Sequence, residues 1–393
     1  MNSLHSDLLA IILARLPIKS ITICNLVCKE WKSIVESEFL RKLFLSHHQN
    51  SHSSWSFICN EPNEEVLAHY GCENWGLSRS LGSYISSFLT DEFQNHKDHP
   101  ENKLVRVVAY TDDGLILVCL LSDSLGRTYY VANPISRQYV KIPPHPRPPH
   151  IRFRHVPSGL VTKVENGVLL GYKVVVMNAN YIRDVIELLI YSSDTGLWSF
   201  TTLHSSLLLR RIVWHNPVNL NGSLYWLGNK QCNPHIQVVV SHDFYAESDL
   251  CQVLHFPDID NKSEFKRPCT TSQGFLMYMN VSLELKLSIW RLESGEWKLV
   301  AQISPKTAFD YITLTINPFD SNTAYVQRKM PHCLACANLH KGKFGDHSSD
   351  DSGILSFAGE WDNAVNGHYS AYATFSLPRW LYRIPSPLSC SNV

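Results

Sequence analysis

The side chains of this chain that are best suited to chemistry include a group with the ligand types that bind zinc. Cys333 and Cys336 form a C-x-x-C pair, and His332, His340 and His347 lie nearby in the sequence. Thiolate and imidazole groups are the usual protein ligands of Zn²⁺. A zinc motif normally has a second pair of ligands at a matching spacing, and the sequence offers no such pair. We therefore predict no metal site and no cofactor.

A second polar segment is proline-rich, basic and aromatic, and it runs from His145 to His155. Its prolines favour an extended loop of the polyproline type. One interpretation, which we favour, is a solvated loop between structural elements. The other is a contact for an acidic or phosphorylated target. The candidate side chains for that contact are Arg147, Arg152, Phe153 and Arg154.

No catalytic arrangement is visible elsewhere in the sequence. The chain lacks the G-x-S-x-G, H-E-x-x-H, Walker and Rossmann motifs. Its 19 histidines follow no spacing that singles out a site. The sequence therefore predicts a binding protein rather than an enzyme.

The composition limits the classes of protein that fit. The chain has 393 residues, 44% of them hydrophobic and 18% charged, with 35 basic against 35 acidic side chains. This balance argues against a nucleic-acid-binding protein and against extensive disorder. The length suits one small module and one large domain. The 11 scattered cysteines, without a signal-peptide pattern or a membrane-spanning run, predict a protein of the cytoplasm or nucleus.

Short helices are expected in the first forty-odd residues, because apolar side chains recur there at helical spacing. Leu8, Ile12 and Leu16 are four residues apart, which gives one apolar stripe. Pro17 is expected to end this helix, and a second helix is predicted over residues 18–26. A third predicted helix carries Trp31, Ile34, Val35, Phe39 and Leu43. So small a bundle cannot bury this much apolar surface by itself, and we expect a partner to dock on it.

A longer set of residues over the same stretch follows a known pattern. The pattern L-P-x-D-L-L-x-E-I-L-x-R-L-P-V-K-S-L, followed by V-C-K-x-W, is matched without gaps by Leu4, Asp7, Leu8, Leu9, Ile12, Leu13, Arg15, Leu16, Pro17, Ile18, Lys19, Ser20, Val27, Cys28, Lys29 and Trp31. This set resembles the F-box of plant-type proteins, the adaptor-binding motif of cullin-based ubiquitin ligases. His5, Ile11 and Ile23 depart from the pattern. The alternatives are an arbitrary helical cap and a DNA-reading helix-turn-helix, and the neutral charge argues against DNA.

The resemblance implies that this module binds a Skp-family adaptor, and through it a cullin and a RING protein that carries the loaded ubiquitin-conjugating enzyme. By that resemblance the adaptor interface consists of Leu4, His5, Leu8, Leu16, Pro17, Ile18, Val27, Cys28 and Trp31. Ile12 and Leu13 are expected to be partly internal. For Trp31 a second interpretation stays open, in which its side chain packs the core of the module.

Beyond residue 50 the helical spacing gives way to short β-type runs that recur along the chain. A polar residue and a glycine precede an apolar run at Gly114, Gly167, Gly222 and Gly274, which are 52 to 55 residues apart. A period of about fifty residues with about four strands is typical of a kelch-like propeller blade. Blades packed around an axis bury both apolar faces and leave only short edges. The alternative is an irregular β-sandwich with glycines spaced by chance.

Several segments of this region follow one another in a familiar order. They are 133–143, 172–175, 190–198, 221–226 and 289–297, preceded by 72–82. Together they resemble the F-box-associated propeller of plant F-box proteins. We therefore predict an α+β multidomain chain, with a small all-α F-box module followed by an all-β propeller of about six blades. The predicted boundaries are 1–46 for the F-box, 47–103 for a linker with the first propeller strands, and 104–393 for the propeller, with a mobile insertion at 328–353.

The resemblance also implies a function. The chain would be the substrate-recognition subunit of a Skp-cullin-F-box ubiquitin ligase, with the target protein on the propeller. It would act by proximity and donate no reacting group. Two alternatives stay open: an F-box scaffold that works outside ubiquitination, and a propeller lectin or enzyme with an incidental helical leader. We expect neither nucleic acid nor a membrane as a partner, and the sequence does not name the target.

Overall fold

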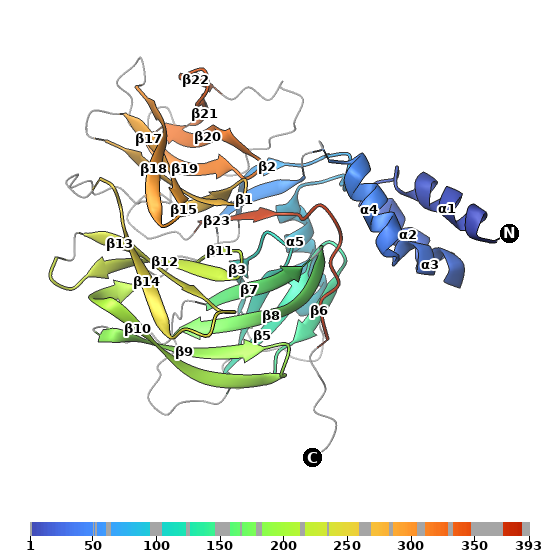
Figure 1. Cartoon of the computed structure of the whole chain (residues 1–393), viewed down its shortest axis with the longest axis horizontal. Coiled ribbons are helices and arrows are strands. Elements are labelled where there is room, and N and C mark those ends of the chain that lie inside the picture. The colour runs from blue at the N-terminus through green and yellow to red at the C-terminus, as the bar shows by residue number, and fades with distance from the viewer. Residues whose placement is uncertain are drawn as a thin grey trace.

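A helical module and a β-propeller stand side by side in this protein (Figure 1). The computed structural model describes residues 2–49, 51, 53–59, 64–94, 104–122, 126–145, 158–165, 167–177, 183–212, 217–233, 236–258, 269–282, 286–304, 311–328, 333–346 and 372–386. The predicted architecture, an all-α module followed by an all-β propeller, is confirmed. Within the described residues, every helix is too short or too polar to cross a membrane.

Four short helices form the N-terminal module: α1 (Asn2–Leu13), α2 (Ile18–Cys24), α3 (Lys29–Val35) and α4 (Glu38–His47). α1 ends before Pro17, as the steric restriction on the residue before a proline predicts. The prediction of a single third helix is wrong, because α3 and α4 share its positions. Ser37 separates them: its hydroxyl oxygen accepts a hydrogen bond from the backbone N–H of Leu40 at 3.1 Å and caps α4.

Six blades surround the propeller axis in the described part of the chain. The first three are made of β23 (Tyr372–Ser376), β1 (Trp55–Cys59) and β2 (Glu64–His69); β3 (Leu104–Tyr110), β4 (Ile116–Ser122), β5 (Gly126–Asn133) and β6 (Gln138–Lys141); and β7 (Ser158–Glu165), β8 (Val168–Met177), β9 (Arg183–Ser192) and β10 (Leu197–Ile212). The last three are made of β11 (Val218–Leu220), β12 (Ser223–Lys230), β13 (Gln237–Asp243) and β14 (Leu250–His255); β15 (Cys269–Ser272), β16 (Phe275–Val281), β17 (Leu287–Glu293) and β18 (Glu296–Ile303); and β19 (Tyr311–Asn317), β20 (Asp320–Arg328), β21 (Cys333–Asn338) and β22 (Lys343–Asp346).

The ring is closed by strands from opposite ends of the propeller sequence. β23 pairs antiparallel with β1, and Trp55 lies opposite Ser376. The inner strands β3, β7, β11, β15 and β19 contact one another in turn, and β23 contacts β3. The hydroxyl oxygens of Thr315 in β19 and Thr374 in β23 lie 3.1 Å apart and complete the circle. Helix α5 (Leu81–Leu89), which continues into the π-helix η1 (Thr90–Gln94), packs on β1 and β2 of the first blade.

The third and fourth blades share one eight-stranded sheet. β10 is 16 residues long, and after pairing with β9 it pairs in parallel with β14, with His204 opposite Leu250. It then pairs with β12, where Leu209 lies opposite Lys230. Outer strands of blades normally present unpaired N–H and C=O groups. The pairing of β10 with β14 therefore covers two edges that are otherwise exposed to other chains.

The recurring glycines make the hairpin turns that the sequence indicates. Asn221 and Gly222 join β11 to β12 with φ angles of 48° and 80°, and Gln273 and Gly274 join β15 to β16 with 50° and 78°. Two successive residues with positive φ match the twist of an antiparallel hairpin, and glycine adopts that conformation without steric cost.

The predicted insertion at 328–353 is wrong for residues 333–346, which form the outer hairpin of the sixth blade. β21 pairs with β20, and β22 pairs with β21. Ala337 is buried against the fifth blade, and Cys336 packs toward the first. Alanine and other small side chains give a weak strand signal, which explains the wrong prediction. Residues 329–332 and 347–353 lie outside the described residues.

Two carboxylates at the axis connect the inner strands. Asp112 and Asp113 lie in the turn between β3 and β4. Asp112 accepts hydrogen bonds from the hydroxyls of Ser376 in β23 at 3.3 Å and Thr271 in β15 at 3.4 Å, and Asp113 accepts one from Thr162 in β7. Burial, and secondly the charge of Asp113, raises the pKa of Asp112 to about 6, although the two hydroxyl donors act in the opposite direction.

We predict that Asp112→Asn stabilises the protein at pH 7. A folded-state pKa of about 6 exceeds the ordinary value of 3.8, so the native state binds the proton more tightly, and the free energy of unfolding falls as pH rises between these values. Asparagine removes the charge, keeps one of the two acceptor oxygens and puts an amide N–H donor in place of the other, where a hydroxyl oxygen can accept from it. It should add about 1–3 kcal/mol to the free energy of unfolding at pH 7. Chemical denaturation from pH 4 to 7 measures this, with Asp7→Asn on exposed α1 as control. An unchanged pH dependence in Asp112→Asn would contradict the assignment.

Candidate partner-binding surface

The helical module leaves a group of large apolar side chains open to solvent. Its most exposed members are Leu26 at 85%, Ile12 at 61%, Val27 at 60%, Ile23 at 59% and Leu8 at 55%. We call these five residues, together with Ile11, the exposed apolar set. They come from α1, from α2 and from the turn that follows α2. Apolar side chains gathered on one small module mark a surface for another protein.

Helical periodicity divides the apolar residues of α1 and α2 between two faces. Leu13 and Ile21 are each 1% exposed and belong to the core of the module. Leu8 and Ile12, four residues apart, lie on a second, exposed side of α1, and Ile23 near the end of α2 and Leu26 in the turn after it are exposed as well. The surplus of apolar residues in the sequence therefore has a structural basis, because each helix carries an apolar residue on more than its core face.

The structure sorts the predicted adaptor-contact residues into groups. Leu8, Val27 and Cys28 are exposed and remain candidates. The side chains of Leu4 and His5 lie outside the described residues, although both are in α1. Those that are half-buried are Leu16, Pro17 and Trp31.

Three side-chain environments differ from expectation. Ile18 is 1% exposed within the core, so the prediction that it contacts an adaptor is wrong. It is the first residue of α2 and points toward the propeller rather than toward solvent. Ile12, expected to be partly internal, is exposed, whereas Leu13 is fully buried. Trp31 packs against the core cluster, which favours its structural interpretation.

Sequence reasoning missed Ile11, Ile23 and Leu26 as candidate contacts. Ile11 and Ile23 stood out only as departures from the family pattern. The signal that could have found Ile23 and Leu26 is their three-residue spacing, which is out of phase with Ile18 and Ile21 within the helix predicted over residues 18–26.

The propeller holds the module through the first turn of α2. The backbone N–H of Ile18 donates to the carbonyl of Asn74 at 2.8 Å, and that of Lys19 donates to the carbonyl of Trp75 at 3.4 Å. The first N–H groups of a helix have no partner within the helix. The loop at residues 72–77 therefore caps α2 with its own carbonyl groups, in a place where Pro17 offers no side-chain cap.

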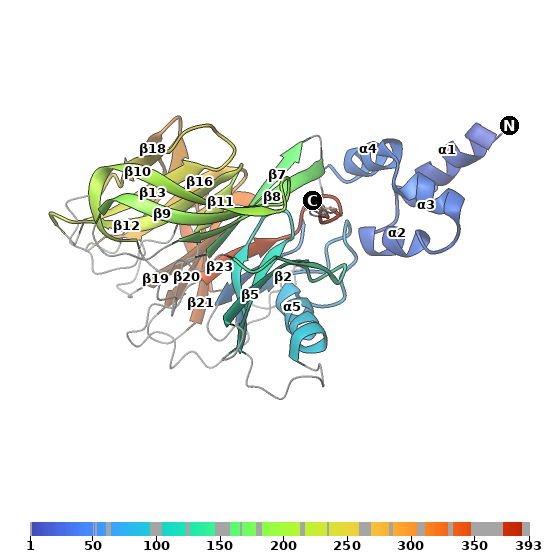
Figure 2. The same cartoon turned by 90° about the horizontal axis from the view of Figure 1, so that it is seen from below.

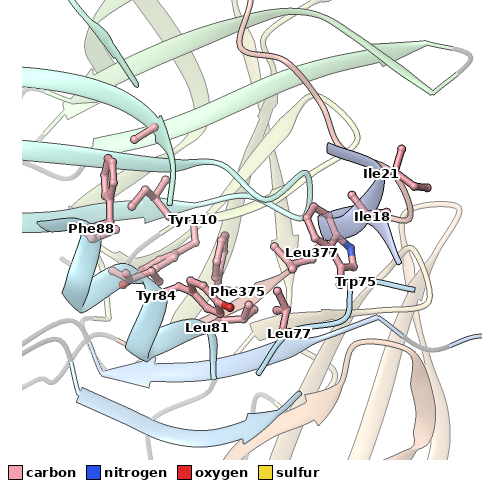
Figure 3. Close-up of a cluster of buried hydrophobic side chains, with 14 of the residues drawn as sticks. Ile18, Ile21, Trp75, Leu77, Leu81, Tyr84, Phe88, Tyr110, Phe375 and Leu377 are labelled. Atoms are coloured by element: carbon pink, nitrogen blue, oxygen red, sulfur yellow. The ribbon is translucent and has the colours of Figure 1, made fainter. Parts of the chain in front are cut away.

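Trp75 connects this loop to the end of the propeller sequence. Its side chain is 1% exposed, and its indole N–H donates to the carbonyl of Pro378 at 2.8 Å. In Figure 3 it lies among Ile18 and Ile21 of α2 and Leu377. One apolar core therefore runs from the helical module into the first and second blades of the propeller without interruption.

Residues 377–386 form a strap between the two parts of the chain. Trp380 meets Phe44 of α4 edge to face at 5.0 Å between ring centroids, and Arg383 forms an ion pair with Glu36. Farther along, Tyr382 and Ile384 pack between the second and third blades. Figure 2 shows the module beside the propeller, and in Figure 1 the strap, in red, passes the module near α4 and then runs toward β6. Much of the apolar surface of the module is thus covered by the chain itself.

The predicted target-binding residues Arg147, Arg152, Phe153 and Arg154 lie outside the described residues. The segment that carries them connects β6 to β7. At its described beginning, the indole of Trp198 donates to the carbonyl of Pro143 at 2.8 Å, and His145 contacts the same ring. Their role as target contacts stays a prediction.

Family comparisons agree with this division of the chain. Residues 1–43 match the F-box domain model, and residues 53–386 match the model described as F-box protein At3g26010-like, beta-propeller. The chain belongs to the F-box proteins with a β-propeller. It is 46% identical to the F-box protein At3g28330 of Arabidopsis thaliana, over 98% of this chain and 97% of that protein. It is 30% identical to the F-box protein At3g26010 of the same plant, over 96% of this chain and 89% of that protein.

Membership of this family gives the helical module a general role. F-box domains bind Skp-family adaptors in ubiquitin ligase complexes, and the proteins that carry them are generally non-catalytic adaptors. Some Arabidopsis relatives of this chain are named F-box/kelch-repeat proteins, in keeping with the kelch-like propeller that the repeats predict. The exposed apolar set lies within the F-box match.

We predict that Gly76→Ala loosens the F-box from the propeller. A Cβ atom at Gly76 would lie 2.7 Å from the Cβ of Pro17, and the φ angle of Gly76 is +64°. Overpacking of this kind costs about 1–3 kcal/mol. Hydrogen exchange at the amides of Ile18 and Lys19 should accelerate, because their acceptor loop must move.

Gly71→Ala is the matched control. Gly71 also has a positive φ, +81°, but a Cβ there meets nothing within 4 Å. The Gly71→Ala variant should lower the free energy of unfolding only by the cost of placing alanine at a positive φ angle, about 1–2 kcal/mol. The protection of the Ile18 and Lys19 amides from hydrogen exchange should stay unchanged. Equal exchange in the two variants would contradict the proposed contact.

Proposed function

We propose that this F-box protein is the substrate-recognition subunit of a Skp-cullin-F-box ubiquitin ligase of the cytoplasm or nucleus. The observation that carries the proposal is the exposed apolar set. The F-box is already docked on its own propeller, and yet six large apolar side chains stay uncovered on α1, on α2 and on the turn after α2. An intramolecular contact does not account for them, and a Skp-family adaptor does.

The energetics of this surface fit a protein partner. Burying one leucine or isoleucine side chain contributes roughly 1.5–3 kcal/mol. Association costs at least about 4 kcal/mol in lost freedom of motion. Several such side chains are needed before binding becomes favourable, and the exposed apolar set supplies them.

In this function the protein contributes by positioning the target relative to the ubiquitin-conjugating enzyme. The adaptor, cullin and RING protein hold the loaded ubiquitin-conjugating enzyme, and the propeller holds the target so that a target lysine meets the thioester. Proximity of this kind raises the effective concentration of the reacting groups. No side chain of this chain is assigned a chemical step.

We place the target on the propeller face formed by the longer connections. The turns from β7 to β8 and from β11 to β12 have two residues each, and the former touches the F-box, where Arg41 donates to the carbonyl of Gly167 at 3.2 Å. The connections from β6 to β7 and from β14 to β15 leave from the opposite strand ends and have 16 and 13 residues. Loops of this kind carry most recognition in rigid scaffolds, and the first of them contains Arg147, Arg152, Phe153 and Arg154.

We predict that the double variant Leu8→Asp/Leu26→Asp no longer co-purifies with a Skp-family adaptor. Both side chains are exposed, so the F-box should keep its fold. The loss of two apolar contacts, with two charges placed in the interface, should weaken binding by about 100-fold or more. The measurement is titration of the full chain with purified adaptor, together with circular dichroism.

The matched control is Leu197→Asp/Leu250→Asp, two equally exposed leucines on β10 and β14 of the propeller, which should bind like wild type. If the wild-type chain is folded but does not bind the adaptor, the proposal is contradicted. A scaffold role outside ubiquitination predicts a different result. The wild-type chain would bind the adaptor, but the protein bound to its propeller would show the same abundance and the same ubiquitination with the wild-type chain as with the Leu8→Asp/Leu26→Asp variant.

A further inference from the structure

The strap, residues 377–386, makes a second contact between the propeller domain and the F-box. It meets the F-box away from α2, at Glu36, which follows α3, and at Phe44 of α4. The first contact, at the loop of residues 72–77, holds α2 by the backbone N–H groups of its first two residues. Arg41 of α4 also donates to the propeller, but through a long, flexible side chain. Residues at the end of a single element are typical hinges, so the contact at α2 leaves a rotation of the F-box open.

The strap starts from a fixed position on the propeller. The backbone N–H of Leu377 donates to the carbonyl of Ser54 at 3.0 Å, and the carbonyl of Pro378 accepts from the indole of Trp75 at 2.8 Å. Both strap residues are buried, and a Cβ atom added to Gly114, in the turn between β3 and β4, would lie 3.0 Å from the Cδ atom of Pro378. The beginning of the strap is therefore part of the closed ring.

The rest of the strap lies between the two domains and contacts both. After a bend at residues 379–380, Tyr382 and Ile384 pack into the core between the second and third blades. Arg383, which lies between them in the sequence, forms its ion pair with Glu36 of the F-box. Side chains that point alternately to opposite sides are what an extended chain produces. The propeller therefore holds the backbone of the strap in place while Arg383 is directed toward the F-box.

The two strap contacts with the F-box differ in strength. The side chains of Arg383 and Glu36 are 63% and 38% exposed, so this ion pair contributes little to stability and is screened by salt. Trp380 is half-buried, and its ring meets that of the fully buried Phe44. A tryptophan ring brings a large apolar area to such a contact. Trp380 therefore supplies the attachment, and the ion pair favours the one orientation of the F-box in which the two charges meet.

We propose that Trp380 and Arg383 are positioning residues that fix the angle of the F-box on the propeller. They restrict the rotation that the contact at α2 leaves open, and they need no contact with an adaptor or a target to do so. The use of a fixed angle rests on the proposed ligase function, in which the adaptor and the target must be held in a set geometry. The restriction itself is a property of the free chain.

The experiment measures the distance between two nitroxide spin labels in the full-length chain by double electron–electron resonance. The labels are attached at Ser33→Cys on α3 and at Glu247→Cys between β13 and β14, both exposed positions, after replacement of the exposed Cys28 and Cys232 by serine. We expect one narrow distance distribution in this parent chain. Trp380→Ala should abolish the narrow peak and give a broad distribution, whereas Trp380→Phe, which keeps an aromatic ring, should retain it.

A charge reversal tests the ion pair in the same way. Arg383→Glu places two carboxylates together and should broaden the distribution, and the double variant Arg383→Glu/Glu36→Arg should restore the narrow peak. A general loss of stability would not be rescued by a second substitution of this kind. Lys32→Ala is included in all of these chains, because Lys32 lies 4.0 Å from Glu36 and would repel an arginine there. Arg379→Ala, an exposed neighbour in the strap, is the matched control and should leave the distribution unchanged.

The outcomes separate this proposal from the ligase function. A narrow distribution that persists in Trp380→Ala or in Arg383→Glu overturns the role of that residue, and a broad distribution in the parent chain overturns the proposal as a whole. Titration with a Skp-family adaptor tests the ligase function independently. Trp380→Ala keeps the exposed apolar set and should bind the adaptor like wild type. A wild-type chain that binds no adaptor, but whose narrow peak is lost in Trp380→Ala and in Arg383→Glu, would contradict the ligase function and support the strap.

Discussion

The structure depends on one short loop, residues 72–77, that is bonded on two sides. Its carbonyl groups accept the first N–H groups of α2, and its Trp75 donates to Pro378. Pro378 follows two residues after β23, the strand that closes the propeller ring. Helix capping, domain docking and ring closure therefore share the same few residues. A change that opens the ring also removes the support for the F-box.

This loop also decides how the apolar surface of the F-box is used. One part is covered by Trp75, Leu377 and Trp380 from the propeller domain. The other part, the exposed apolar set, faces away from that contact and stays available for a partner. A shared core holds the two domains in one orientation, whereas a flexible linker would allow many. Position is the only contribution that the proposed mechanism requires from this subunit, so a fixed orientation suits it.

The sequence was sufficient to predict the two domains but not to predict the contact between them. Gapless matching of a long motif and glycines at a regular interval predict the F-box and the propeller, because helix phase and hairpin turns are local properties. The burial of Ile18 was not predictable, because its neighbours Trp75 and Leu377 are distant in the sequence. The helix break at Ser37 and the hairpin around Cys336 were not predicted for another reason. Their sequence signals, a single capping residue and a run of small residues, are weak.

The central claim is that the F-box is held rigidly on the propeller. The most direct test is single-molecule energy transfer between dyes attached at Glu30 on α3 and Lys343 on β22, both of which are exposed. The account predicts one narrow distribution of transfer efficiency, unchanged when a Skp-family adaptor binds. A broad distribution, or several interconverting populations in the wild-type chain, would contradict it.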